Sequence, residues 1–125
     1  MTKQILSKDV EDYVKNNPKS VLIDVRTEEE WNSDGKPDGE KISLKIYFLT
    51  IQFADKTFNQ NFIEDFKKLN IEKGCEVLTM CMGGVRSQMA AELLTKEDYK
   101  CLNISDGFLG NTENMGWKNS GLPCK

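Results

Sequence analysis

Short apolar runs that alternate with helix-like segments constrain the fold of this chain more than any other feature. Three runs have the length and composition of buried strands, at residues 21–25, 76–80 and 99–104. Between these runs, residues 59–70 and 87–94 repeat apolar side chains at the helical spacing. A strand followed by a helix and then by another strand of the same sheet needs a crossover, which makes the strands parallel. The sequence therefore predicts an α/β fold with a central, mostly parallel sheet and helices on both faces.

The length of the chain sets the size of this fold. A chain of 125 residues corresponds to one domain, which we predict to span residues 1–125. Further helices are predicted from Ser7 to about Asn16, over residues 28–31 and near Trp117.

The apolar run at residues 46–53 leaves two interpretations open. Its pattern fits either a strand or a helix, and burial in the core is the simpler interpretation. Alternatively, two exposed aromatic side chains of this run line the active site or a partner surface. The run is far too short to cross a bilayer. With a net charge of −3, the chain also has no basic excess for nucleic acid or anionic lipid, so we predict neither nucleic acid nor a membrane as a partner.

The complete absence of histidine excludes several kinds of active site. It removes Ser-His-Asp triads, Cys-His pairs and imidazole ligands for zinc or haem. The cysteines form no C-x-x-C pair, which argues against a zinc ribbon or a thioredoxin-like site. We therefore expect no metal and no other cofactor. Any nucleophile therefore has to be activated by a carboxylate, by a lysine, by oriented backbone groups, or by an intrinsically lowered pKa.

The spacing of the cysteines also argues against a disulfide framework. Cys75 and Cys81 flank one short predicted strand, which would hold their Cα atoms about 20 Å apart. A disulfide needs less than about 7 Å between these atoms. The start of the chain, MTKQILSKDVEDY, has no apolar signal-peptide core. These features favour a reducing, cytoplasmic compartment, although removal of a leader would leave the same sequence.

The segment between the second buried strand and the following helix carries the chemistry. It reads CMGGVRS and consists of Cys81, Met82, Gly83, Gly84, Val85, Arg86 and Ser87. The two glycines permit a sharp turn after the strand, and the serine is suited to cap the helix that follows. Such a turn directs backbone N–H groups and the positive end of the helix dipole toward a thiolate, and Arg86 adds a fixed charge. We therefore predict that Cys81 is a nucleophile and the reactive thiol of the chain.

The other three cysteines have a simpler interpretation. Cys75, Cys101 and Cys124 are interpreted as small core residues, because cysteine is among the most frequently buried residue types. Core packing gives no reason for the glycines and the arginine that follow Cys81. Whether Cys101 or Cys124 approaches Cys81 as a resolving thiol stays open.

These residues resemble those of a known family. The segment CMGGVRS is similar to the Cys-x-x-Gly-x-Arg-Ser loop of single-domain rhodaneses, which are sulfurtransferases. The segment VLIDVRTEEEW resembles the family's Leu-Ile-Asp-Val-Arg strand with its following glutamate and aromatic, and WKNSGLP resembles its closing Trp-x-x-x-Gly-x-Pro. The resemblance covers about residues 5–123 and implies a rhodanese-like three-layer α/β fold.

The resemblance also implies a persulfide mechanism without a cofactor. Cys81 would take sulfur from a small anionic donor such as thiosulfate and pass it to a thiol or a protein cysteine. Arg86 would hold the donor's oxygens or orient the loop, and Asp24 and Arg26 would support the loop from the neighbouring strand end. Asp24 and Arg26 also suit a purely structural ion pair. The loop contains one basic residue, fewer than in relatives that favour thiosulfate.

Two other functions remain open. Cysteine phosphatases and arsenate reductases also place a cysteine and an arginine around an anion, but with the spacing Cys-x5-Arg rather than the Cys-x4-Arg found here. The shorter loop leaves less room for a tetrahedral oxyanion and suits a single sulfur atom. The second alternative is a non-catalytic rhodanese-like binding or regulatory module. Such modules commonly lose the cysteine, which this chain retains.

Overall fold

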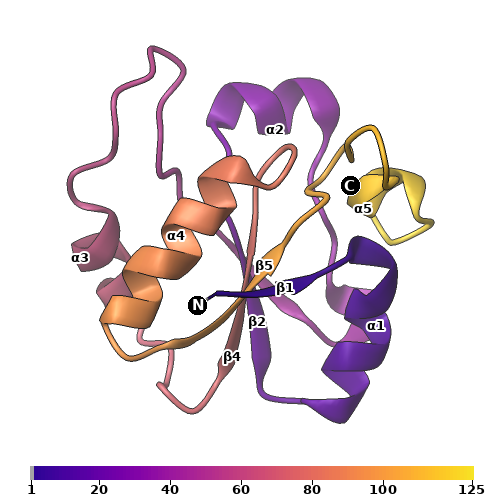
Figure 1. Ribbon diagram of the computed structural model, residues 1–125, viewed down its shortest axis with the longest axis horizontal. Helices are drawn as coiled ribbons and strands as arrows, with labels where there is room; N and C mark the ends of the chain where they lie inside the picture. Colours follow the sequence, from indigo (N-terminus) through magenta and orange to yellow (C-terminus); the bar gives the residue numbers. More distant parts are fainter. Residues whose placement is uncertain (1) are drawn as a thin grey trace.

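The computed structural model describes residues 2–125 and confirms the α/β fold (Figure 1). Within these residues, five strands form one parallel sheet in the order β1-β5-β4-β2-β3. The strands are β1 (Lys3–Ile5), β2 (Ser20–Asp24), β3 (Lys45–Phe48), β4 (Glu76–Met80) and β5 (Lys100–Ile104). Asp24 at the end of β2 is paired with Met80 at the end of β4. Arg26 and Cys81 therefore leave the sheet at the same edge.

Helices cover both faces of the sheet, which confirms the predicted layers (Figure 1). The helical elements are α1 (Ser7–Asn16), α2 (Glu28–Asp34), the 3₁₀ turn η1 (Glu40–Ile42), α3 (Phe62–Lys68), α4 (Val85–Lys96) and α5 (Gly116–Asn119). Helices α3 and α4 pack on one face, and α1 and α5 pack on the other. Helix α2 follows the carboxyl end of β2, beside the start of α4 in Figure 1.

Each face of the sheet buries its own apolar cluster. Successive residues of a strand point to opposite faces, so Ile23 packs toward α3 and α4 whereas its neighbour Leu22 packs toward α1 and α5. Trp117 of α5 is fully buried in the second cluster, and its Nε1 donates to the Pro123 carbonyl oxygen at 2.8 Å. The helix predicted near Trp117 is thus confirmed, and its tryptophan fastens the tail to the sheet.

Three local features differ from the prediction. Helix α4 begins at Val85, two residues earlier than predicted, because Gly84 takes a left-handed conformation and turns the chain sharply. The run at 46–53 is a strand only to Phe48 and then continues as a loop. Strand β1 was not predicted, since it has three residues at an edge of the sheet and shows no apolar alternation.

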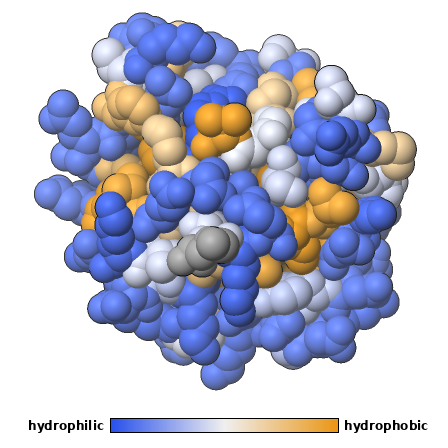
Figure 2. Space-filling model, viewed as in Figure 1, coloured by the Kyte–Doolittle hydropathy of each residue, from blue (hydrophilic) through white to orange (hydrophobic). Residues whose placement is uncertain are grey.

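The surface offers few apolar areas. On the face shown in Figure 2 the surface is mainly hydrophilic, and apolar residues gather in small separate patches. No helix within residues 2–125 is both long and apolar enough to span a membrane.

Candidate active site

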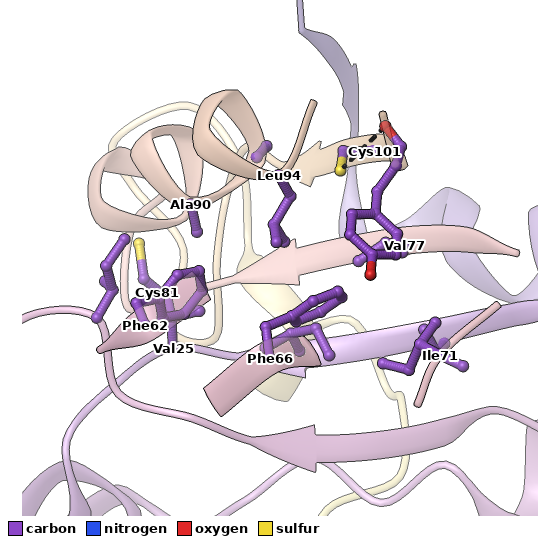
Figure 3. Packing of buried hydrophobic residues seen from close by; sticks show 14 residues of the cluster. Val25, Phe62, Phe66, Ile71, Val77, Cys81, Ala90, Leu94 and Cys101 are labelled. Carbon is purple, nitrogen blue, oxygen red and sulfur yellow. Dashed lines mark hydrogen bonds between the residues drawn. The ribbon is translucent and has the colours of Figure 1, made fainter. Parts of the chain in front are cut away.

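Cys81 lies directly after β4, between the sheet and α4 (Figure 3). Its side chain belongs to the apolar cluster that includes Val25, Phe62 and Ala90, and only 1% of the residue is exposed. Burial of this kind is also typical of a cysteine that only fills space in a core. The polar groups around the sulfur therefore decide between the two roles.

Two groups that can donate hydrogen bonds face the Cys81 sulfur. The Gly84 N–H donates to Sγ with the nitrogen and sulfur 3.1 Å apart. The Ser87 hydroxyl oxygen lies 3.3 Å from the same sulfur. A space-filling cysteine needs no donors, whereas a thiolate is stabilised by them. The 81–87 loop thus places two polar groups against the sulfur; that they stabilise a thiolate stays a prediction.

Of the two loop glycines, only Gly84 is required by the backbone. Gly84 has a φ of 108°, and a Cβ there would lie 2.2 Å from the Ser105 carbonyl oxygen. A Cβ at Gly83 would meet nothing closer than the Gly110 carbonyl oxygen at 3.8 Å. The expectation that both glycines shape the turn is therefore wrong for Gly83.

This difference predicts unequal effects of two neighbouring substitutions. Gly84→Ala is expected to lower the free energy of unfolding by about 1–3 kcal/mol, because alanine is strained at this φ and collides with backbone. Gly83→Ala, the matched control, is expected to change it by less than about 1 kcal/mol. Urea denaturation of the two variants measures both values. Equal losses in the two variants would show that the close approach to Ser105 is not what selects glycine.

The sequence predicts that Ser87 caps the helix, and the structure shows that it does not. It lies in the first turn of α4, and Gly84 occupies the capping position. Its hydroxyl contacts both the Cys81 sulfur and Oδ1 of Asn103, which lies on β5. Because α4 begins earlier than predicted, the Ser87 hydroxyl points toward the Cys81 sulfur instead of capping the helix.

Arg86 is bound by a carboxylate of the chain itself. Its Nη1 donates to Glu30 Oε1 at 2.6 Å, and its Nη2 donates to Glu30 Oε2 at 2.8 Å. This is the two-pronged pairing that makes arginine a strong carboxylate ligand. The hydrogen bond to Glu30 raises the pKa of Arg86. Arg86 thereby joins the first turn of α4 to α2.

Glu30 is a site residue that sequence reasoning missed. Its Oε1 accepts hydrogen bonds from the N–H and the hydroxyl of Thr27, and its own N–H donates back to the Thr27 hydroxyl. Although burial acts in the opposite direction, the hydrogen bonds from Arg86 and Thr27 lower the pKa of Glu30 to about 2. The carboxylate therefore stays ionised at neutral pH, and its contribution to stability is lost only as the pH falls from about 4.5 toward 2. The Thr-x-x-Glu capping pattern was the available signal.

Asp24 and Arg26 form a fully buried ion pair. Arg26 Nη2 lies 2.9 Å from Asp24 Oδ2, and neither side chain is exposed. The Arg26 guanidinium also stacks on the Phe108 ring, 4.1 Å from its centroid. The Phe108 N–H in turn donates to the Cys81 carbonyl oxygen at 2.8 Å. The pair is thus structural, and it reaches the loop through Phe108.

The outer residues of the loop are less enclosed. Val85 is exposed, and Met82 is half-buried with its carbonyl oxygen accepting from the Leu109 N–H at 3.2 Å. Among residues 81–87, Val85 is thus the one that is exposed.

A cleft of about 360 Å³ lies beside the loop. It is lined by Thr27, Glu29, Glu30, Gln52, Phe53, Ala54, Lys56 and Arg86. Among residues 2–125, Arg86 is the one member of the predicted site that lines it. Phe53, at the end of the apolar run 46–53, lines the cleft. Phe48 instead packs edge-to-face against Trp31. One of the two exposed aromatics therefore borders the candidate site.

No other thiol lies near Cys81 on the sheet. Cys101 of β5 is paired with Val77, four residues before Cys81, which corresponds to about 13 Å along the strand. Figure 3 shows Cys101 beside Val77, well away from Cys81. Burial raises the pKa of Cys101 to about 11, which also makes it a poor resolving thiol. Cys124 is exposed in the tail, so its interpretation as a small core residue is wrong, and it forms an isolated β-bridge with Pro37. All four cysteines of the described chain are free.

Across the described part of the chain, no group of three histidine, cysteine, aspartate or glutamate side chains is placed to hold a metal ion.

Comparison with known proteins gives consistent similarities. A sequence model of the rhodanese-like domain matches residues 7–113. An uncharacterized protein of Rickettsia prowazekii is 39% identical over 109 residues, covering 86% of this chain and 84% of that protein. A crystal structure from M. tuberculosis is 30% identical, with a TM-score of 0.86 over 99% of this chain and 97% of that one. A Rhodopseudomonas palustris structure described as a possible tyrosine phosphatase is 19% identical, with a TM-score of 0.63 over 99% of this chain and 85% of that one, and shares the fold alone.

Proposed function

The chain belongs to the rhodanese-like domain family, and from this we propose that it is a sulfurtransferase that carries sulfur as a persulfide on Cys81. One observation supports the proposal most directly. The Cys81 sulfur, although buried, faces the Gly84 N–H and the Ser87 hydroxyl, both from the turn that follows it. Donors in this position stabilise a thiolate, which is the reactive form of cysteine.

The proposed reaction has two steps. The Cys81 thiolate attacks the outer sulfur of a donor such as thiosulfate, a new S–S bond forms, and sulfite leaves with the electron pair of the broken bond. The negative charge then resides on the outer sulfur of the persulfide. An acceptor thiolate, or cyanide in an assay, attacks that outer sulfur, takes it, and restores the Cys81 thiolate. Electrons and charge balance in both steps without an oxidant or a metal.

The partners follow from this chemistry. We propose a small anionic sulfur compound as the donor and a thiol or a protein cysteine as the acceptor. The cleft beside Arg86 and Glu30 is the proposed approach of the donor.

The mass of the intact protein tests the first step. After incubation with thiosulfate and removal of the excess, the protein is expected to gain one sulfur atom, which dithiothreitol then removes. Peptide mapping should place that sulfur on Cys81. A persulfide on another cysteine, or no gain with any sulfane-sulfur donor, would overturn the proposal.

The Glu30–Arg86 pair predicts that thiosulfate is a poor donor for the native protein. An anionic donor has to compete with the Glu30 carboxylate for the Arg86 guanidinium. Glu30→Gln removes this competing charge and is expected to raise kcat/KM for thiosulfate about tenfold, the scale of one hydrogen bond to a charged group. Thiocyanate formation at varied thiosulfate concentration measures the change.

Glu29→Gln is the matched control for that change. Glu29 lines the same cleft and carries the same charge, but its carboxylate is not the one that holds Arg86. We expect Glu29→Gln to alter kcat/KM by less than about threefold, the effect of a screened charge. If the two variants respond equally, or if Glu30→Gln lowers the value, then Glu30 does not compete with the donor.

A further inference from the structure

The second hydrogen-bond donor at Cys81 is shared with a buried asparagine. Asn103 lies on β5, and only 2% of it is exposed. Its Oδ1 is 2.5 Å from the Ser87 hydroxyl oxygen, which also contacts the Cys81 sulfur. Ser87 thus stands between the nucleophile and the asparagine.

A backbone carbonyl fixes which way the Asn103 amide points. Its nitrogen Nδ2 is 3.1 Å from the Gly84 carbonyl oxygen, which only accepts hydrogen bonds. The amino group must therefore face Gly84, and the amide oxygen must face Ser87. The side-chain oxygen of Gln4 accepts from the same Nδ2 at 2.9 Å and holds this orientation.

The Ser87 hydroxyl has one proton for two acceptors. The short contact with Asn103 Oδ1 requires that proton between the two oxygens, because an amide oxygen has none of its own. Ser87 then offers only a lone pair to Cys81, which suits a protonated thiol. A Cys81 thiolate is itself a pure acceptor, so it and Oδ1 compete for the same proton.

We propose that Asn103 is a positioning residue that holds the Ser87 proton away from Cys81 in the resting thiol and releases it to the thiolate. The inference rests on the proposed role of Cys81 as the nucleophile. When the persulfide forms, negative charge leaves Sγ for the outer sulfur, and the hydroxyl returns to Asn103. The asparagine thereby sets how readily Cys81 ionises and how strongly the attacking sulfur is hydrogen-bonded.

Among residues 2–125, the charged groups near Cys81 are paired with one another. Helix α4 contributes Arg86, and α2 contributes Glu30, which is paired with Arg86. The end of β2 contributes the paired Asp24 and Arg26. From α3 and the loop before it, the cluster around Cys81 receives the apolar side chains of Phe62 and Ile51. Substitutions at Asn103 leave all of these groups unchanged.

The pH dependence of Cys81 alkylation tests the proposal. Iodoacetamide labelling, resolved by peptide mass, gives the rate at Cys81 as a function of pH. Asn103→Leu removes the competing acceptor and is expected to move the profile to lower pH by about one unit, a tenfold change in the thiolate fraction. Asn103→Asp supplies a stronger, negatively charged acceptor and is expected to move it to higher pH.

A double-mutant cycle separates this role from a general loosening of the loop. In the Ser87→Ala background, Asn103→Leu is expected to leave the profile unchanged, because no hydroxyl proton remains to redistribute. Gln4→Leu, which removes a partner of Nδ2 but keeps Oδ1, is expected to leave the native profile unchanged. A shift that persists in the Ser87→Ala background, or shifts of the same sign in Asn103→Leu and Asn103→Asp, would overturn the proposal.

This experiment does not depend on sulfur transfer. Alkylation reports the ionisation of Cys81 whether or not a persulfide forms. Opposite shifts in a protein that transfers no sulfur would support the role of Asn103 and refute the proposed function. Sulfur transfer without any shift would refute only the role of Asn103. Should Asn103→Leu fail to fold, as judged by circular dichroism, the smaller uncharged variant Asn103→Ala, measured with and without Ser87→Ala, provides the same test.

Discussion

Cys81→Ser is expected to abolish sulfur transfer from thiosulfate to cyanide, with a loss of at least about a thousandfold in thiocyanate formation. A serine hydroxyl is a far weaker nucleophile for sulfur than a thiolate and cannot form a persulfide. The substitution keeps the size of the side chain and an acceptor for the Gly84 N–H, so the fold should persist. Near-native thermal unfolding of the variant would verify this.

Cys101→Ser is the control for that experiment. Cys101 is also buried in the same apolar cluster, but it lies on β5 beside Val77, far along the sheet from the loop. Its replacement is expected to leave thiocyanate formation unchanged. A comparable loss in both variants would mean that the effect comes from disturbed packing rather than from removal of the nucleophile.

The same pair of variants distinguishes the alternative functions. Hydrolysis of p-nitrophenyl phosphate that depends on Cys81, without thiocyanate formation, would indicate a phosphatase. If the native protein shows no activity in either assay, a binding or regulatory module would be favoured. The loop spacing argues against phosphatase chemistry, because the Cys-x4-Arg loop is one residue shorter than the phosphatase loop. The Glu30–Arg86 pair does not separate the two functions, since Glu30 would compete with a phosphate for Arg86 just as it competes with thiosulfate.

The central strands and the loop could be predicted because their signals are local. Strands β2, β4 and β5 are apolar on both faces, which is typical of strands covered by helices on two sides. Cys81 and Arg86 stand out because the residues between them include two adjacent glycines. Strand β1 is exposed and has three residues, too few for any periodic signal.

The supporting residues of the site depend on contacts between distant parts of the chain. Three consecutive glutamates begin α2, and only the helix phase set by the Thr27 cap brings Glu30 to Arg86, 56 residues away. For Asn103 the sequence contains only a weak signal, which is a polar residue within a mostly apolar strand. A buried amide needs partners, but one sequence does not reveal that Ser87 and Gly84 supply them.

The largest expected effect on stability comes from the Asp24–Arg26 pair. Arg26→Met leaves the Asp24 carboxylate buried without its counter-charge, and the expected cost is about 3–5 kcal/mol of unfolding free energy. That is a large part of the about 5–15 kcal/mol that stabilises a typical domain. Asp24→Leu alone should cost a similar amount, since it leaves a buried guanidinium unpaired. Urea denaturation followed by tryptophan fluorescence provides the measurement, because Trp117 is fully buried in the native state.

The double variant Asp24→Leu/Arg26→Met shows whether charge is the cause. Removing both charges together leaves neither one unpaired, so the double variant is expected to lose less stability than the two single variants combined. Lys67→Met is the surface control, because the Lys67–Glu97 pair is exposed to solvent and its loss should change stability little. If Arg26→Met were as mild as Lys67→Met, the loss of the buried counter-charge would not be a major cost to stability. Since the Arg26 guanidinium stacks on Phe108 and the Phe108 N–H binds the Cys81 carbonyl, Arg26→Met should also slow Cys81 alkylation or sulfur transfer under conditions where it remains folded.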